Sequence, residues 1–179
     1  MMHSGPLQIR LTNALNGCPY RLMRANEINC DDAQIARIVS ICNEPEVYAW
    51  LFREPLDGKA YKTTKARDWL KWSAAGWAAG SHFVFAVIDD HQHIAAACDI
   101  KSRDPVAEIG YWASRHHRGI MTNVVKAMCD WASEAGFQGL FARTKLANSA
   151  SQAVLERAGF SEVPSEEGDY RRFQLSLGR

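Results

Sequence analysis

The sequence has little excess charge of either sign. Its 21 Lys and Arg residues nearly balance 20 Asp and Glu residues, which gives a formal net charge of +1 at pH 7. A protein that binds nucleic acid by neutralising phosphates normally carries a strongly basic stretch, and this sequence has none. We therefore expect no nucleic-acid partner.

Long apolar runs and paired cysteines are also missing. No run is long enough to cross a bilayer, and the opening MMHSGPLQIR lacks the apolar segment of a signal peptide. The five cysteines are scattered, and no two have CxxC spacing: Cys18, Cys30, Cys42, Cys98 and Cys129. This pattern predicts reduced thiols in a cytoplasmic protein without a membrane segment.

Several catalytic signatures are absent too. The sequence has no Walker loop, GxGxxG or GxSxG motif, so nucleotide hydrolysis, Rossmann redox chemistry and α/β-hydrolase chemistry lack support. Two histidine pairs stand in expected turns, at 91 and 93 and at 116 and 117, without an acidic or cysteine partner at ligand spacing. We expect no metal site.

The residues that are present describe an ordinary globular protein. The chain has 179 residues, of which 47% are hydrophobic and 23% charged, as in one domain with a sizeable core. Alternating and helical apolar spacings predict the order βααβββαβαββ, with an N-terminal arm or edge strand in residues 1–16. This order predicts an α/β fold, in which a mixed, mostly antiparallel sheet has helices on both faces. The expected helix starts are Asp31, with Gln34 completing a capping box, Thr64, and Ser149, with Gln152 completing another.

The most informative stretch is residues 108–160. It contains EIGYW at 108–112, RGIMT at 118–122, NSAS at 148–151 and LERAGF at 155–160. The periodicity predicts a strand, a basic turn at Gly119, a helix that ends at Gly136, a further strand and a helix that ends at Gly159. A turn of this kind at a helix N-terminus has free backbone N–H groups and favours an anion.

These four motifs, in this order and near this spacing, resemble the GNAT superfamily of acyl-CoA N-acyltransferases. Within it they resemble the branch that acetylates the N-termini (alanine among them) of ribosomal proteins, and its small-amine relatives. The resemblance covers about the last half of the chain well, and residues 20–33 more loosely. It implies one acetyltransferase-like domain over residues 1–179, with residues 108–160 as the acetyl-CoA-binding core.

One departure from the family concerns the loop that binds the pyrophosphate. The family usually reads Gln/Arg-x-x-Gly-x-Gly/Ala, and one overlay places His116, Gly119 and Met121 on those positions. The other overlay matches HRG at 117–119 and deletes two loop residues, one of them a glycine. In either overlay the loop is short for this branch.

The resemblance also implies roles for individual residues. Backbone N–H groups of residues 111–113 would polarise the thioester carbonyl, those of residues 118–122 would cradle the pyrophosphate, and the NSAS motif would contact the pantetheine arm. The other interpretation of NSAS is helix capping alone. The implied coenzyme-binding residues are Tyr111, Trp112, Ala113, Arg118, Gly119, Ile120, Met121, Thr122, Asn148 and Ser151.

Acetyl transfer to an amine also requires proton transfer, since a free α-amine has a pKa near ~8 and a lysine near ~10.4. Glu108 is the first candidate for the base, because the family places this strand beside the thioester. Asp99 is the second, as an acid in an apolar run where burial would raise its pKa, and a structural role as a cross-strand partner is the equally supported interpretation. Many family members use a tyrosine as the acid, but Leu155 stands at that position here, which leaves Ser151 or water.

We therefore interpret the chain as an acetyl-CoA-dependent N-acetyltransferase that acts directly on a primary amine. The acceptor is open: a protein N-terminus, an amino acid, a polyamine or an aminoglycoside-like amine. Core packing is the favoured interpretation for most aromatic residues between positions 46 and 77. The family's acceptor lid lies in the same region, so the resemblance leaves a pocket-lining role open for Trp50, Phe52 or Trp72. A weak or inactive coenzyme-binding or interaction module is the alternative function, and family members often form homodimers.

Overall fold

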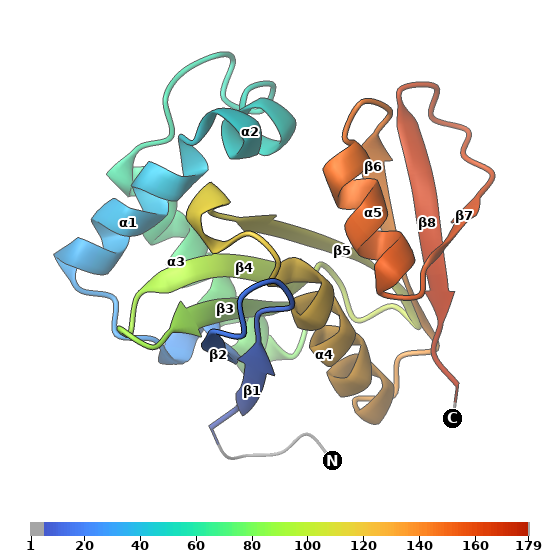
Figure 1. Ribbon diagram of the computed structural model, residues 1–179, viewed down its shortest axis with the longest axis horizontal. Coiled ribbons are helices and arrows are strands. Elements are labelled where there is room, and N and C mark those ends of the chain that lie inside the picture. The colour runs from blue at the N-terminus through green and yellow to red at the C-terminus, as the bar shows by residue number, and fades with distance from the viewer. Residues whose placement is uncertain (1–5, 179) are drawn as a thin grey trace.

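The computed structural model describes residues 6–178, which form one twisted sheet with helices on both faces (Figure 1). The eight strands lie in the order β1-β2-β3-β4-β5-β6-β8-β7. Every neighbouring pair is antiparallel except β5 and β6, which are parallel. The strands are β1 (Gln8–Thr12), β2 (Pro19–Arg24), β3 (Phe83–Asp89), β4 (Ile94–Ile100), β5 (Val106–Ala113), β6 (Gly139–Lys145), β7 (Ser161–Val163) and β8 (Tyr170–Ser176).

The helices divide between the two faces. One face packs against α4 and α5, where Val124, Val125 and Leu155 are fully buried. The other face packs against α1 and α3 through residues such as Ile38 and Ala66. The helical elements are η1 (Ala25–Glu27), α1 (Asp32–Cys42), α2 (Pro45–Val47), the π-helical turn η2 (Tyr48–Phe52), α3 (Thr63–Ala79), η3 (Arg115–His117), α4 (Met121–Glu134) and α5 (Ser149–Arg157). The predicted fold class, the helices on both faces and the N-terminal edge strand are confirmed.

The sheet separates in its middle. Only residues 106–108 of β5 pair with residues 139–141 of β6, although both strands continue for several residues beyond that point. Past Glu108 each strand keeps its outer partner, β4 or β8, and the two halves of the sheet diverge. The backbone N–H and C=O groups that would have paired across β5 and β6 are therefore available at the gap.

Three predicted helix starts were only partly right. Asp31 does cap α1 by accepting from the N–H of Gln34, but the Gln34 side chain bonds to Gln92 and Ile94 instead of closing a capping box. The next long helix begins two residues early, since its N-cap is Lys62 and not Thr64, and no side chain caps it.

The last helix is capped by Asn148 and not by Ser149. Asn148 accepts from the Ser151 N–H at 3.2 Å, while the Gln152 amide donates to the carbonyls of Lys145 and Leu146. Asn is as good an N-cap as Ser, so the sequence pattern did not distinguish adjacent positions. The glycine stops at Gly136 and Gly159 are confirmed, with φ values of +86° and +97°.

Candidate active site

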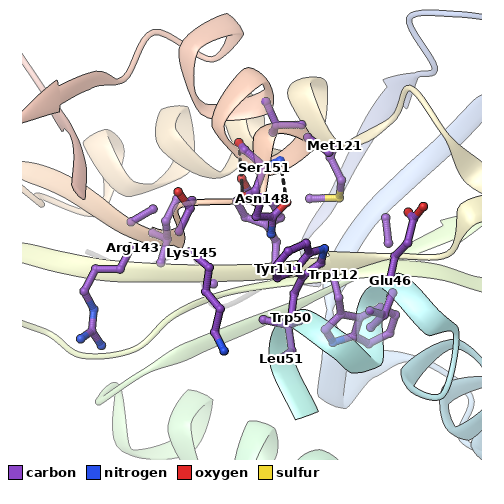
Figure 2. A pocket seen from close by; sticks show the side chains of 18 of the residues that line it. Glu46, Trp50, Leu51, Tyr111, Trp112, Met121, Arg143, Lys145, Asn148 and Ser151 are labelled. Carbon is purple, nitrogen blue, oxygen red and sulfur yellow. Dashed lines mark hydrogen bonds between the residues drawn. The ribbon is translucent and has the colours of Figure 1, made fainter. Parts of the chain in front are cut away.

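A cavity of about 440 Å³ lies where β5 and β6 separate. Figure 2 shows that it reaches both faces of the sheet. Met121, Asn148 and Ser151 line it on the side of α4 and α5, while Trp50 and Leu51 of the π-helical turn line it on the opposite side. Two molecules entering from opposite faces would therefore meet at the gap between the strands.

A row of unpaired N–H groups lies at the start of α4. Among residues 6–178, no hydrogen-bond acceptor faces the backbone N–H of any of the five consecutive residues 118–122. The first N–H groups of a helix have no partner within the helix, and the helix dipole adds positive potential at the same end. Residues 118–122 thus suit a phosphate or pyrophosphate group.

Basic side chains surround this row. Arg118 is exposed and makes no ion pair among the described residues, and Arg157 of α5 donates to the Thr122 hydroxyl at 3.3 Å. Arg115 and His116 are also exposed on η3. The donors present therefore fit the diphosphate of a coenzyme-A-type molecule.

Ser151 and Tyr111 form a polar pair inside the cavity. The Tyr111 hydroxyl lies 2.7 Å from Ser151 Oγ and donates to the Ser151 carbonyl at 3.1 Å. Burial raises the pKa of Tyr111 to about 12, an effect that the hydrogen bond to Ser151 partly offsets. The phenol is therefore neutral at physiological pH and fixes the position of the serine hydroxyl.

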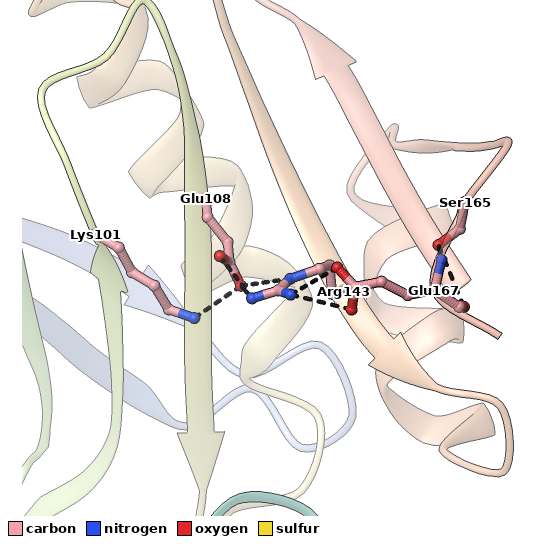
Figure 3. Close-up of polar contacts among 5 residues, drawn as sticks. All are labelled: Lys101, Glu108, Arg143, Ser165 and Glu167. Atoms are coloured by element: carbon pink, nitrogen blue, oxygen red, sulfur yellow. Dashed lines mark hydrogen bonds and ion pairs between the residues drawn. The ribbon is translucent and has the colours of Figure 1, made fainter. Parts of the chain in front are cut away.

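Glu108 lies in a chain of ion pairs on the α1 and α3 side of the sheet (Figure 3). Lys101 Nζ is 2.8 Å from Glu108 Oε1, and Arg143 contacts both carboxylate oxygens at 3.1–3.2 Å. Arg143 also binds Glu167 at 2.8 Å. This chain links β4, β5, β6 and the loop before β8 beside the gap, and an incoming amine would have to displace a cation to reach Glu108.

Asp99 has a different environment, although it is only two residues from Lys101. It lies opposite Gly110 of β5, and a Cβ atom at Gly110 would be 3.2 Å from Asp99 Oδ1. Oδ1 is shielded from solvent and has no hydrogen-bond partner among the described residues. Burial raises the pKa of Asp99 to about 6, and the charge of Glu108 also raises it, while Lys101 and a hydrogen bond from the Gly110 backbone lower it.

The three aromatic residues of the expected lid differ in what they contact. Trp50 lines the cavity. Phe52 packs on Tyr61 with ring centroids 4.8 Å apart, and Trp72 stacks on His82 at 4.1 Å. Core packing therefore accounts for Phe52, while Trp72 lies on α3 away from the cavity-lining residues.

The structure brings most of the predicted site residues together. Glu108, Tyr111, Trp112, Ala113, Met121, Asn148 and Ser151 line the cavity. Arg118, Gly119, Ile120 and Thr122 do not line it and lie in the adjoining loop and first turn of α4.

Sequence reasoning missed the basic residues of the cavity wall. Lys101, Arg143 and Lys145 bring positive charge to the cavity wall, where Lys145 pairs with Glu54 at 3.2 Å. Strand alternation could have placed Arg143 and Lys145 on one face, but not opposite their partners. Among residues 6–178, no group of three His, Cys, Asp or Glu residues could hold a metal ion, and no helix is long and apolar enough to cross a membrane.

A split sheet with a two-sided cavity and an N–H row at one helix start defines the class of an acyl-coenzyme-A transferase. A model of the acetyltransferase (GNAT) domain family matches residues 27–161, which is most of the chain. The chain belongs to this family. No curated protein matches it significantly.

Solved structures with this fold include several acetyltransferases of low sequence identity. A ribosomal L7/L12 α-N-protein acetyltransferase, solved with coenzyme A, is 14% identical, with a TM-score of 0.72 over 94% of this chain and 98% of that one. The ribosomal-protein-S5-alanine acetyltransferase of Vibrio fischeri is 15% identical, with a TM-score of 0.71 over 96% and 97%. The spermidine N-acetyltransferase of Vibrio cholerae, solved with CoA and spermine, is 13% identical, with a TM-score of 0.68 over 88% and 95%.

Proposed function

We propose that this acetyl-CoA-dependent N-acetyltransferase transfers acetyl directly to a primary amine at the gap between β5 and β6. The observation that carries this proposal is the cavity open to both faces, with the N–H row of residues 118–122 beside one mouth. Residues 108–160 would form the coenzyme-binding core, and the acceptor would enter from the face that carries Trp50. Asp99 does not line the cavity itself and lies opposite Gly110 of its wall. Holding both substrates in this geometry supplies several kcal/mol of the barrier.

Coenzyme binding is assigned to the α4 and α5 side. Residues 118–122 donate N–H groups to the pyrophosphate, and Asn148 and Ser151 contact the pantetheine arm. Of residues 111–113, Tyr111 and Ala113 direct their N–H groups toward the gap that β6 has left, since Trp112 pairs with Ala97 of β4, and these two N–H groups would polarise the thioester carbonyl. The bound coenzyme supplies the activated acetyl group.

The base is one of two carboxylates on the acceptor side. Glu108 remains a candidate by its place in the cavity wall. Asp99 is the stronger one, because Oδ1 has no hydrogen-bond partner in the described chain and its pKa of about 6 suits proton abstraction near neutral pH. Asp99 and Lys101 pack closely over Gly110, where a Cβ atom would lie 3.2 Å from Asp99 Oδ1 and 3.3 Å from Lys101 Cε.

Ser151 is assigned to the departing sulfur. Its hydroxyl donates a hydrogen bond to the charge that develops as the C–S bond breaks, while the Tyr111 O–H turns from the Ser151 carbonyl to donate to Ser151 Oγ and hold it. With a pKa of about 12, Tyr111 is too weak an acid to protonate the departing thiolate, whose conjugate thiol has a pKa of ~8.5, so it orients Ser151. The pair thereby takes the role of the tyrosine that many family members carry at the position of Leu155.

The acceptor class is proposed from charge and from the relatives. Two proteins of similar structure are a ribosomal L7/L12 α-N-protein acetyltransferase and a spermidine N-acetyltransferase. In this chain the cavity wall carries three acidic and three basic side chains, so it does not select a strongly charged acceptor. They are Glu46, Glu54, Glu108, Lys101, Arg143 and Lys145. We therefore propose an uncharged or singly charged primary amine, such as a peptide N-terminus, in a cytoplasmic setting consistent with five unpaired cysteines.

The test is calorimetric binding of acetyl-CoA to the purified protein, followed by thiol release with a panel of amines. We expect low-micromolar binding and thiol release that depends on a peptide N-terminus or small amine. Binding without thiol release by any amine would contradict direct transfer, and no binding at millimolar coenzyme would contradict the assigned site.

A further inference from the structure

The short loop between β5 and α4, residues 114–120, is held by three side chains from distant segments. Glu44, at the junction of α1 and α2, accepts from the Ser114 hydroxyl and the Arg115 N–H, both at 2.7 Å. The Tyr20 hydroxyl lies 2.8 Å from Nδ1 of His117. These two contacts fix the first half of the loop.

The second half of the loop is held by the turn between β1 and β2, residues 13–18. Asn13 is 2% exposed, and its Nδ2 donates to the Arg118 carbonyl at 2.8 Å. The N–H of Ala14 donates to the Gly119 carbonyl at 3.3 Å. Asn13 Oδ1 in turn accepts from the Leu15 N–H at 2.9 Å, which closes the turn on itself.

The approach of this turn to the loop is close enough to require glycine. Gly119 has φ = +97°, and a Cβ atom there would lie 2.5 Å from Asn13 Oδ1 and 2.6 Å from Leu15 Cγ. Any other residue at position 119 would be strained by its φ and would push the turn away. Gly119 therefore allows the contact as well as the bend.

These bonds determine where two N–H groups of the loop point. In a trans peptide the C=O of one residue and the N–H of the next point in opposite directions. Because the carbonyls of Arg118 and Gly119 are bound to the turn, the N–H groups of Gly119 and Ile120 are directed away from it. Both belong to the row of N–H groups without acceptors in the described chain.

We propose that Asn13 and the turn of residues 13–18 are a positioning device for coenzyme binding, which orients the Gly119 and Ile120 N–H groups toward the pyrophosphate. The inference rests on the proposed function and extends it to a segment outside the coenzyme-binding core. A short loop with one glycine has few ways to direct its own N–H groups, and the turn supplies that constraint from outside. The Asn123 amide adds a further tie by donating to the Thr12 carbonyl at 2.6 Å.

The experiment compares three acetyl donors in wild type, Asn13→Ala and Asn13→Asp. Acetyl-CoA and acetyl-dephospho-CoA carry the pyrophosphate, whereas S-acetylpantetheine lacks it. Asn13→Asp keeps the side-chain volume and the acceptor for Leu15 but loses the donor to Arg118. We expect KM for both pyrophosphate donors to rise on the order of tenfold, with kcat nearly unchanged, and kcat/KM for S-acetylpantetheine to stay within twofold.

Gln34→Ala is the matched control. Gln34 is 7% exposed and, like Asn13, bridges backbone groups, donating to the Gln92 carbonyl and accepting from the Ile94 N–H on the far side of the sheet. It should lose a similar amount of thermal stability without a donor-dependent change in KM. An equal loss with S-acetylpantetheine in the Asn13 variants, or the same donor dependence in Gln34→Ala, would overturn the inference.

Calorimetric binding of CoA separates this inference from the proposed function. If wild type binds CoA but transfers acetyl to no amine, direct transfer fails, while about tenfold weaker CoA binding by Asn13→Ala than by Gln34→Ala still supports the positioning role. Unchanged CoA affinity in both Asn13 variants would overturn that role, whatever the transfer assay gives.

Discussion

Replacing Asp99 with Asn should stabilise the protein at neutral pH. The pKa of Asp99 is raised from its ordinary value of 3.8 to about 6, chiefly by burial, so the folded state holds its ionised form at a cost. A change of this size corresponds to on the order of 3 kcal/mol. Because the residue is only partly buried and Lys101 is nearby, we expect a measured gain of about 1–2 kcal/mol at pH 7.5.

The gain should depend on pH in a defined direction. The folded state of wild type binds the Asp99 proton more tightly than the unfolded state, so the wild type loses stability as pH rises from about 4 to about 6. At pH 4 the carboxyl group is neutral in the folded state and only partly ionised in the unfolded state, so the advantage of Asp99→Asn should be much smaller than at pH 7.5. Urea unfolding at pH 4 and pH 7.5 measures both values.

The same substitution should remove catalysis. If Asp99 takes the proton from the amine, Asp99→Asn should lower kcat/KM by about 10²–10⁴-fold and abolish the bend near pH 6 in the wild-type pH profile. Asp130→Asn, on the exposed face of α4, removes the same charge far from the gap and is the control. A variant that is more stable at pH 7.5 but retains full activity would refute the catalytic role. Equal destabilisation at both pH values would refute the assigned environment.

Three further predictions concern the site. Glu108→Gln should lower thermal stability, because Lys101 loses its anion and Arg143 keeps only Glu167. It should cost activity less than Asp99→Asn does, and a larger loss in kcat/KM would make Glu108 the base. Ser151→Ala should reduce kcat by roughly 10–100-fold, and adding Tyr111→Phe should cost little more in a double-mutant cycle, whereas additive losses would show that the two act separately. Arg118→Gln should raise KM for acetyl-CoA several-fold at low salt and less at high salt, and a salt-independent effect would contradict a phosphate contact.

The parts of the fold that followed from the sequence are those with local causes. The helical spacing of Val124, Val125 and Met128 predicted one buried face of α4, and these side chains are fully buried. The glycine stops at 136 and 159 were right because a positive φ at a helix end is a property of single residues. The start of α5 was displaced by one residue, since adjacent Asn and Ser both make good caps and the tertiary structure chooses between them.

The polar contacts that distinguish this site depend on segments far apart in the chain. Tyr111 meets Ser151 across 40 residues, Arg143 meets Glu108 across 35, and Asn13 meets Arg118 across 105. No periodicity or motif connects such pairs, because each depends on strand register and on where the sheet separates. The family resemblance also had no counterpart for them, since it placed an acid at Leu155 and assigned no role to the N-terminal turn.

The balance of charge over the whole chain hides a local arrangement with functional consequences. Lys101 and Arg143 both pair with the carboxylate of Glu108. Asp99 keeps one carboxylate oxygen, Oδ1, that has no hydrogen-bond partner among the described residues. Glu108 therefore restrains the sheet where it separates and keeps Lys101 and Arg143 occupied, which frees Asp99 for the amine. On this reasoning Glu108→Gln should shift the bend in the pH profile of kcat/KM to lower pH, because the released cations would stabilise the ionised form of Asp99. A bend that stays near pH 6 would show that the two carboxylates act independently.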